Sequence, residues 1–198
     1  MTGPSLAAAG PTAALVPGAV SAGAGPAGVV RVGAGGWTVV EVGGGEFGFS
    51  AAHAGLHGGL FEPLHGHTFG VTLRLSGTPD PVAGMLVDFA VVKAALRAAI
   101  GPLRRRTLMP AEAPGVTVRV ADGRVVACDG RKRYDLPAED VTLLPLANTT
   151  TEEIAGWLLG RVLPSLCEVA GLRRVELAVS EAPDTTAAAT VDLAPGTP

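Results

Sequence analysis

The segment from His65 to Leu75 constrains the fold more than any other part of the chain. Apolar side chains alternate there with small or polar ones: Phe69, Val71, Leu73 and Leu75 against Gly70, Thr72 and Arg74. A period of two is typical of a β-strand with one buried face. His65 and His67 share the parity of the apolar residues. If the strand begins at or before them, both imidazoles point toward the buried side.

Three of the four histidines, His53, His65 and His67, fall within fifteen residues. Neutral imidazole is a common zinc ligand, and three protein ligands with one open position describe a catalytic zinc site. Buried histidines that are hydrogen-bonded to the backbone would fit the same parity. The fourth histidine, His57, lies in a glycine-rich stretch, and we interpret it as a loop residue.

The remaining patterns predict an α+β chain with two helices between two pairs of strands. The first pair is a strand interrupted by Gly43-Gly44-Gly45, followed by the strand of His65 to Leu75. Asp88 is expected to cap the first helix after a short strand at 84–87, and Thr149-Thr150-Thr151-Glu152 the second. Turn signals at Asp122-Gly123 and Asp129-Gly130 predict a β-rich insert, a hairpin or small meander, over residues 111–140. The last strands are expected at 175–181 and 188–193.

Composition suggests a low-complexity flexible leader at 1–32 and one folded domain at 33–194. Residues 1–30 contain no Asp, Glu, Lys or Arg, so they offer little to a packed structure. The net charge of -3 gives no basic footprint for nucleic acid. The sequence contains no window of about 18 uninterrupted apolar residues, so we expect no membrane helix. Two cysteines in no ligand or disulfide pattern favour a reduced, cytoplasmic setting.

Five segments in register give a family resemblance: Phe49-Ser50-Ala51-Ala52-His53, Leu64-His65-Gly66-His67-Thr68-Phe69, Gly84-Met85-Leu86-Val87-Asp88-Phe89, Thr150-Thr151-Glu152-Glu153-Ile154-Ala155 and Val179-Ser180-Glu181. In these the chain resembles the 6-pyruvoyl-tetrahydropterin synthase family, which includes the 6-carboxytetrahydropterin synthases. The resemblance implies a tunnelling fold, a four-stranded antiparallel sheet with two helices on one face. It also implies a trimeric or hexameric homo-oligomer and a small-molecule substrate, 7,8-dihydroneopterin triphosphate.

The resemblance assigns roles to particular residues. His53, His65 and His67 would hold Zn²⁺, and Glu181 would anchor the pterin ring through a bidentate carboxylate. Thr150 and Thr151 match residues beside the ring, although they would also cap a helix. Glu181 could instead be a surface carboxylate at the end of a strand.

Two features of the family are missing. The usual catalytic cysteine precedes the His-x-His by four to six residues, but this stretch holds none, and no Asp-His pair follows the first helix. Glu62-Pro63-Leu64-His65 matches Glu-x-x-His, the signature of a subgroup that uses glutamate and releases 6-hydroxymethyl-7,8-dihydropterin. Glu62 is therefore the expected catalytic residue of a lyase, with pyruvoyl or carboxy products as alternatives. Glu62 could also be an ordinary loop carboxylate.

Other interpretations remain. A pterin- and zinc-binding homologue without lyase activity would also explain the two missing features. A cupin-type metal site expects a glutamate soon after the second histidine, and residues 68–72 contain none. Arg104, Arg105 and Arg106 could bind the triphosphate, but a solvated cluster at the helix C-terminus, where positive charge is favourable, is the better explanation.

Overall fold

A computed structural model describes residues 36–194, so the predicted leader at 1–32 lies outside the described residues. The central strand is β5 (His65–Gly77), which does begin at the first histidine of the pair. Strand β11 (Leu172–Ala182) pairs with one side of β5, and β12 (Thr185–Asp192) pairs with β11. The other side of β5 is shared, with β2 (Phe49–His53) on its first half and β1 (Thr38–Val42) on its second.

These pairings are all antiparallel. Strands β1 and β2 together act as one interrupted strand, joined by a short 3₁₀ turn at Gly45–Phe47. The four-stranded antiparallel sheet of the tunnelling fold is therefore confirmed, including the interruption at its three glycines.

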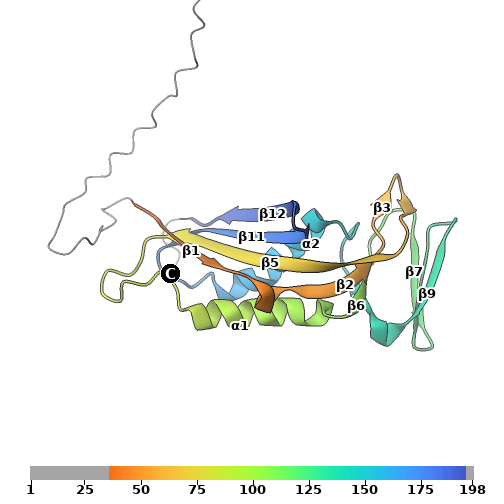
Figure 1. Ribbon diagram of the computed structural model, residues 1–198, viewed down its shortest axis with the longest axis horizontal. Coiled ribbons are helices and arrows are strands. Elements are labelled where there is room, and N and C mark those ends of the chain that lie inside the picture. Colours follow the sequence, from red (N-terminus) through yellow and green to blue (C-terminus); the bar gives the residue numbers. More distant parts are fainter. Residues whose placement is uncertain (1–35, 195–198) are drawn as a thin grey trace, which may run out of the picture. The chain divides into compact units, whose positions relative to one another are not determined.

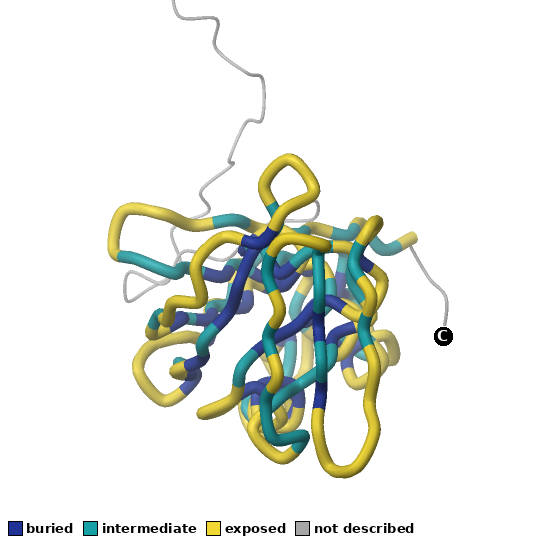
Figure 2. Tube along the Cα trace, turned by 90° about the vertical axis from the view of Figure 1, so that its right-hand side faces the viewer, coloured by how far each residue is buried: buried dark blue, intermediate teal, exposed yellow. Residues whose placement is uncertain are grey.

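The described residues form two α-helices, α1 (Phe89–Ile100) and α2 (Thr151–Val162). Asp88 caps α1 as predicted, because its Oδ1 accepts a hydrogen bond from the N–H of Ala90 at 2.8 Å. Both helices cover the same face of the sheet (Figure 1). The core lies between them and is filled by alternate strand residues and by helix residues at helical spacing: Phe69, Val71, Leu73, Leu75, Val92, Leu96, Ile154, Leu158, Val175 and Leu177. Figure 2 shows this burial along the strands, with exposed hairpin loops.

Two further strands extend the sheet beyond β2. Strand β6 (Arg106–Pro110) lies parallel to β2, and β10 (Val141–Leu144) lies parallel to β6. The sequence did not predict them, because neither short run alternates in polarity. The sequence predicted Arg104, Arg105 and Arg106 at the C-terminal end of a helix, and this prediction was incomplete. Helix α1 ends at Ile100, a 3₁₀ turn covers Gly101–Leu103, and Arg106 already belongs to β6.

A small hairpin follows the first histidine. It consists of β3 (Leu56–His57) and β4 (Leu60–Phe61). Gly58 and Gly59 form its turn with φ values of 60° and 80°, a conformation that favours glycine at both positions. The interpretation of His57 as a loop residue was therefore wrong, since it lies in a short strand.

The insert is a three-stranded antiparallel sheet, and it shares a small core with Ala54, Phe61 and Met109. Its strands are β7 (Thr117–Ala121), β8 (Arg124–Cys128) and β9 (Arg133–Pro137). It lies at the same end of the molecule as the β3–β4 hairpin (Figure 1). Further 3₁₀ turns occur at Ala138–Asp140 and Leu163–Ser165.

The short strand expected at 84–87 is absent from the described residues; a turn at 81–83 precedes this segment, which is irregular with a bend at 86–87. Asp80 explains the difference, because its Oδ1 accepts from the N–H groups of Val82 and Ala83 at 2.8 and 2.7 Å. Gly84 then takes a φ of 68°. Among the residues described, no helix is long and apolar enough to cross a membrane.

Candidate active site

The three histidines meet at the end of the sheet. His53 and His65 are directly opposite each other in the β2–β5 register, and His67 follows on the same face. The ring centroid of His53 lies 4.6 Å from that of His65 and 5.3 Å from that of His67. One ring nitrogen from each histidine can be chosen so that all three lie within 4.8 Å of one another. Strand pairing alone thus brings the three histidines together as a cluster of nitrogen donors.

Backbone carbonyls orient two of these rings. The Nδ1 of His53 lies 2.8 Å from the carbonyl oxygen of Thr149, and the Nδ1 of His65 lies 2.8 Å from that of Pro63. A carbonyl oxygen only accepts, so each Nδ1 carries the hydrogen and each Nε2 keeps its lone pair. The two Nε2 atoms are therefore the groups available to a ligand.

Among the three histidines, His53 most clearly offers a free ring nitrogen to a ligand. Its side chain is 4% exposed, and its buried Nε2 has no hydrogen-bond partner among residues 36–194. Burial lowers the pKa of His53, and the neighbouring His65 and His67 lower it further. The neutral form that a metal requires is thus favoured.

The donor set fits zinc. Bonds of about 2.1 Å in a tetrahedral arrangement place ligand nitrogens about 3.4 Å apart, which a small movement of these rings would reach from the observed limit of 4.8 Å. Three imidazoles, two of them oriented by carbonyls, leave a fourth position for another molecule.

Glu62 lies in the same cavity. It follows β4 directly, and its N–H donates to the carbonyl of Gly55 at 2.8 Å. A side chain at Gly55 would bring its Cβ within 3.3 Å of the Glu62 Oε2, so glycine leaves the space that this carboxylate uses. The cavity has a volume of about 380 Å³, and its lining includes His53, His65, Glu62, Thr150, Thr151 and Glu181.

Helix α2 and strand β11 also contribute to the cavity wall, through Thr151 and Glu181. The hydroxyl of Thr151 donates to the Oε2 of Glu181 at 2.7 Å, and the Thr150 hydroxyl accepts from the N–H of Glu153 at 3.4 Å. Thr150 therefore caps the helix, while Thr151 fixes a carboxylate at its N-terminus. The helix dipole stabilises negative charge at this position.

The arginine cluster does not join this cavity. Arg104 and Arg105 line a separate and larger cavity of about 800 Å³. Arg106 donates to the carbonyl of Glu139 instead. We place the chemistry in the smaller cavity, because only that one combines imidazoles with Glu62. Glu181 lines both.

Sequence reasoning missed two residues at this site. His57 lines the smaller cavity. Asn148 binds both backbone groups of Leu56, since its Oδ1 accepts from the N–H at 2.8 Å and its Nδ2 donates to the carbonyl at 3.0 Å. The position of Asn148 just before the three threonines was a signal, but its partner lies 92 residues away.

Known proteins resemble this chain over most of its described length. The family model described as 6-pyruvoyl tetrahydropterin synthase matches residues 45–192. The chain is 24% identical over 135 residues to a candidate 6-carboxy-5,6,7,8-tetrahydropterin synthase of Methanocaldococcus jannaschii, which covers 67% of this chain and 83% of the relative.

Solved structures show the same fold. The 6-pyruvoyl tetrahydropterin synthase of Plasmodium falciparum matches with a TM-score of 0.74 at 24% identity, covering 79% of this chain and 99% of the other. The Plasmodium vivax enzyme, solved as a variant in which a catalytic glutamate is replaced by alanine, matches with a TM-score of 0.71 at 25% identity, with the same coverage.

Proposed function

Because the chain belongs to the 6-pyruvoyl tetrahydropterin synthase family, we propose that it is a zinc-dependent lyase acting on 7,8-dihydroneopterin triphosphate. The favoured product is 6-hydroxymethyl-7,8-dihydropterin, formed by cleavage of a carbon–carbon bond. One observation carries this proposal: Glu62 lines the same cavity as His53, His65 and Glu181.

Three histidines would hold the metal: His53, His65 and His67. Bound there, Zn²⁺ acts as a Lewis acid that makes the protons of side-chain hydroxyls easier to remove. The carbonyls of Thr149 and Pro63 keep His53 and His65 in the orientation that such binding needs.

Glu62 is the proposed general base. It takes the proton from the hydroxyl on the second side-chain carbon of the substrate. The bond between the first and second carbons then breaks, and the phosphorylated fragment leaves as an aldehyde. Returning the proton to the first carbon completes the hydroxymethyl product. A glutamate is described as a catalytic residue in the related Plasmodium vivax enzyme, which supports this assignment.

Glu181 is the proposed anchor of the pterin ring, with Thr150 and Thr151 beside it. We expect Glu181→Gln to raise the KM for the substrate about 10- to 100-fold, because a charge-assisted hydrogen bond contributes about 1.5–3 kcal/mol. Steady-state kinetics measure this. The control is Glu176→Gln on the same strand, whose carboxylate pairs with Arg74. An unchanged KM in Glu181→Gln would assign the anchor elsewhere.

The identity of the product tests the proposed reaction. Zinc-loaded protein is incubated with 7,8-dihydroneopterin triphosphate, and the pterin released is identified by mass. We expect 6-hydroxymethyl-7,8-dihydropterin. A 6-pyruvoyl or 6-carboxy product would mean that synthase chemistry proceeds without the usual cysteine. Pterin binding without any product would favour the alternative, a homologue that binds zinc and pterin but lacks lyase activity.

By the same family membership we propose that the chain acts as a homo-oligomer, a trimer or a hexamer. We also propose that residues 33–194 form the pterin synthase-like domain and residues 1–32 a flexible leader.

A further inference from the structure

The hairpin that carries Glu62 is held from outside on both of its strands. Leu56 and Phe61 face each other across the two strands. Asn148 binds the N–H and the carbonyl of Leu56 on the β3 side. On the β4 side, the backbone groups of Phe61 are bound by side chains of the insert.

Three insert residues reach the backbone of Phe61: Asp129, Lys132 and, more weakly, Arg131, whose Nη2 donates to the Phe61 carbonyl at 3.4 Å. The Phe61 N–H donates to the Oδ2 of Asp129 at 2.7 Å, and the Phe61 carbonyl accepts from the Nζ of Lys132 at 2.7 Å. These side chains occupy the place of a neighbouring strand along the β4 edge. Asp129 also accepts from the N–H groups of Arg131 and Lys132. Hydrogen bonds from Lys132 and Phe61 lower the pKa of Asp129 to about 2, so its carboxylate stays charged at neutral pH.

A fourth insert residue reaches Glu62 itself. The hydroxyl of Tyr134 donates to the backbone carbonyl of Glu62 at 2.9 Å. The Tyr134 ring also packs edge-on against Phe61, with ring centroids 5.4 Å apart. Phe61 is 1% exposed and lies in a small core with Ala54, Met109 and Ala127. The residue before Glu62 is thus buried against the insert, while the Glu62 side chain stays at the cavity.

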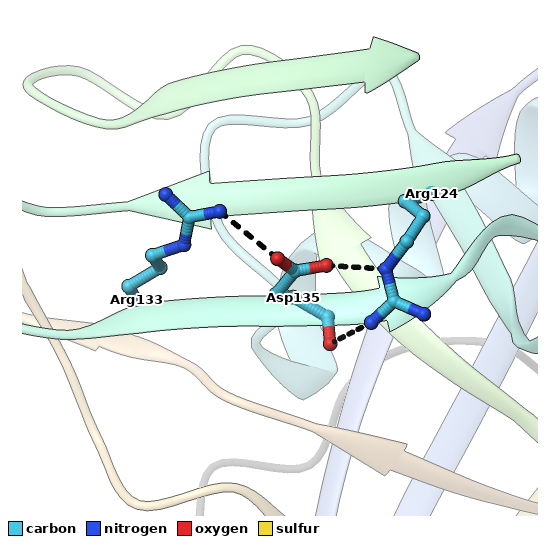
Figure 3. Close-up of polar contacts among 3 residues, drawn as sticks. All are labelled: Arg124, Arg133 and Asp135. Carbon is cyan, nitrogen blue, oxygen red and sulfur yellow. Dashed lines mark hydrogen bonds and ion pairs between the residues drawn. The ribbon is translucent and has the colours of Figure 1, made fainter. Parts of the chain in front are cut away.

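The insert sheet contains ion pairs of its own. Asp135 on β9 pairs with Arg124 on β8 at 2.6 Å and with Arg133 at 2.9 Å (Figure 3). These ion pairs are exposed, and such pairs contribute little to stability. They do not contact the hairpin, so Asp135 provides a matched control within the same sheet.

We propose that the insert sheet positions Glu62, with Asp129 and Tyr134 as positioning residues that hold the backbone of Phe61 and Glu62 so that the carboxylate stays in the cavity lined by His53 and His65. This inference rests on the proposed function. A two-stranded hairpin is marginally stable by itself, and a displacement of a reacting group by about 1 Å can reduce a rate about 100-fold. An exposed carboxylate on such a hairpin therefore needs support from another element.

The test compares Asp129→Asn and Tyr134→Phe with Asp135→Asn. Tyr134→Phe keeps the ring on Phe61 and removes only the hydroxyl. We expect kcat to fall about tenfold in Asp129→Asn and about threefold in Tyr134→Phe, with KM within about twofold and zinc content unchanged. Hydrogen exchange over residues 56–62 should accelerate in Asp129→Asn. Asp135→Asn should match the wild type in all four measurements.

The outcomes distinguish the proposed function from the positioning role of the insert. A wild-type protein that forms no product would reject the proposed function. An active wild type, with Asp129→Asn and Tyr134→Phe retaining its kcat and its exchange rates, would overturn the positioning role alone. A fall in kcat that is equally large in Asp135→Asn would also overturn it, because the effect would then be general to the insert.

Discussion

Replacement of Glu62 by glutamine is expected to abolish measurable turnover while zinc stays near one ion per chain. Glutamine has the same shape, so it should keep the contact above Gly55, but it cannot accept the substrate proton. Loss of a general base costs typically about 10²- to 10⁴-fold in rate. The measurement is kcat at saturating substrate together with metal content.

The matched control is Glu112→Gln, at an exposed residue outside the cavity. It should keep the wild-type kcat. Full activity in Glu62→Gln would refute the assigned role and would leave the carboxylate as an ordinary loop residue. Loss of zinc in Glu62→Gln would indicate instead that Glu62 is a fourth ligand of the metal.

Removal of one histidine from the cluster should remove the metal. We expect His53→Ala to lower zinc affinity by more than about 100-fold, because even a change in the groups that support a ligand costs about 10- to 100-fold. Turnover should fall to background. Zinc per chain is measured after dialysis against buffer without metal.

His57→Ala is the control for this variant, since His57 is the one histidine outside the cluster. It should retain zinc. His53 is buried, so His53→Ala could also disturb folding, and His67→Ala at a half-buried position provides a second variant. Retention of zinc by both His53→Ala and His67→Ala, with circular dichroism unchanged, would contradict the metal site.

The sequence predicted those parts of the fold that local physical rules determine. The parity of His65 with Leu73 depends only on the geometry of one strand, and the structure keeps it through Gly77. The cap at Asp88 follows from the orphan N–H groups of a helix start. The structure brings His53 and Glu62 to one cavity, although their common position was inferred from family resemblance rather than from spacing.

The missed parts depend on contacts between distant residues. Strands β6 and β10 are each stabilised by parallel partners far along the chain, and parallel pairing leaves no short turn signal. Asp129 and Tyr134 reach the Glu62 hairpin across 68 and 72 residues. In sequence they look like an ordinary turn aspartate and a strand tyrosine. Their partners become visible only when the insert is placed beside the hairpin.

The parallel pairing of β6 with β10 has a consequence for the insert between them. A chain that leaves one strand and enters a parallel neighbour must travel back along the length of the strand before it can pair. The insert is therefore anchored at two separate points on the sheet rather than at the two adjacent ends of a hairpin. Such a connection resists rotation of the insert as a hinged loop, so the insert is held in a fixed position relative to the sheet.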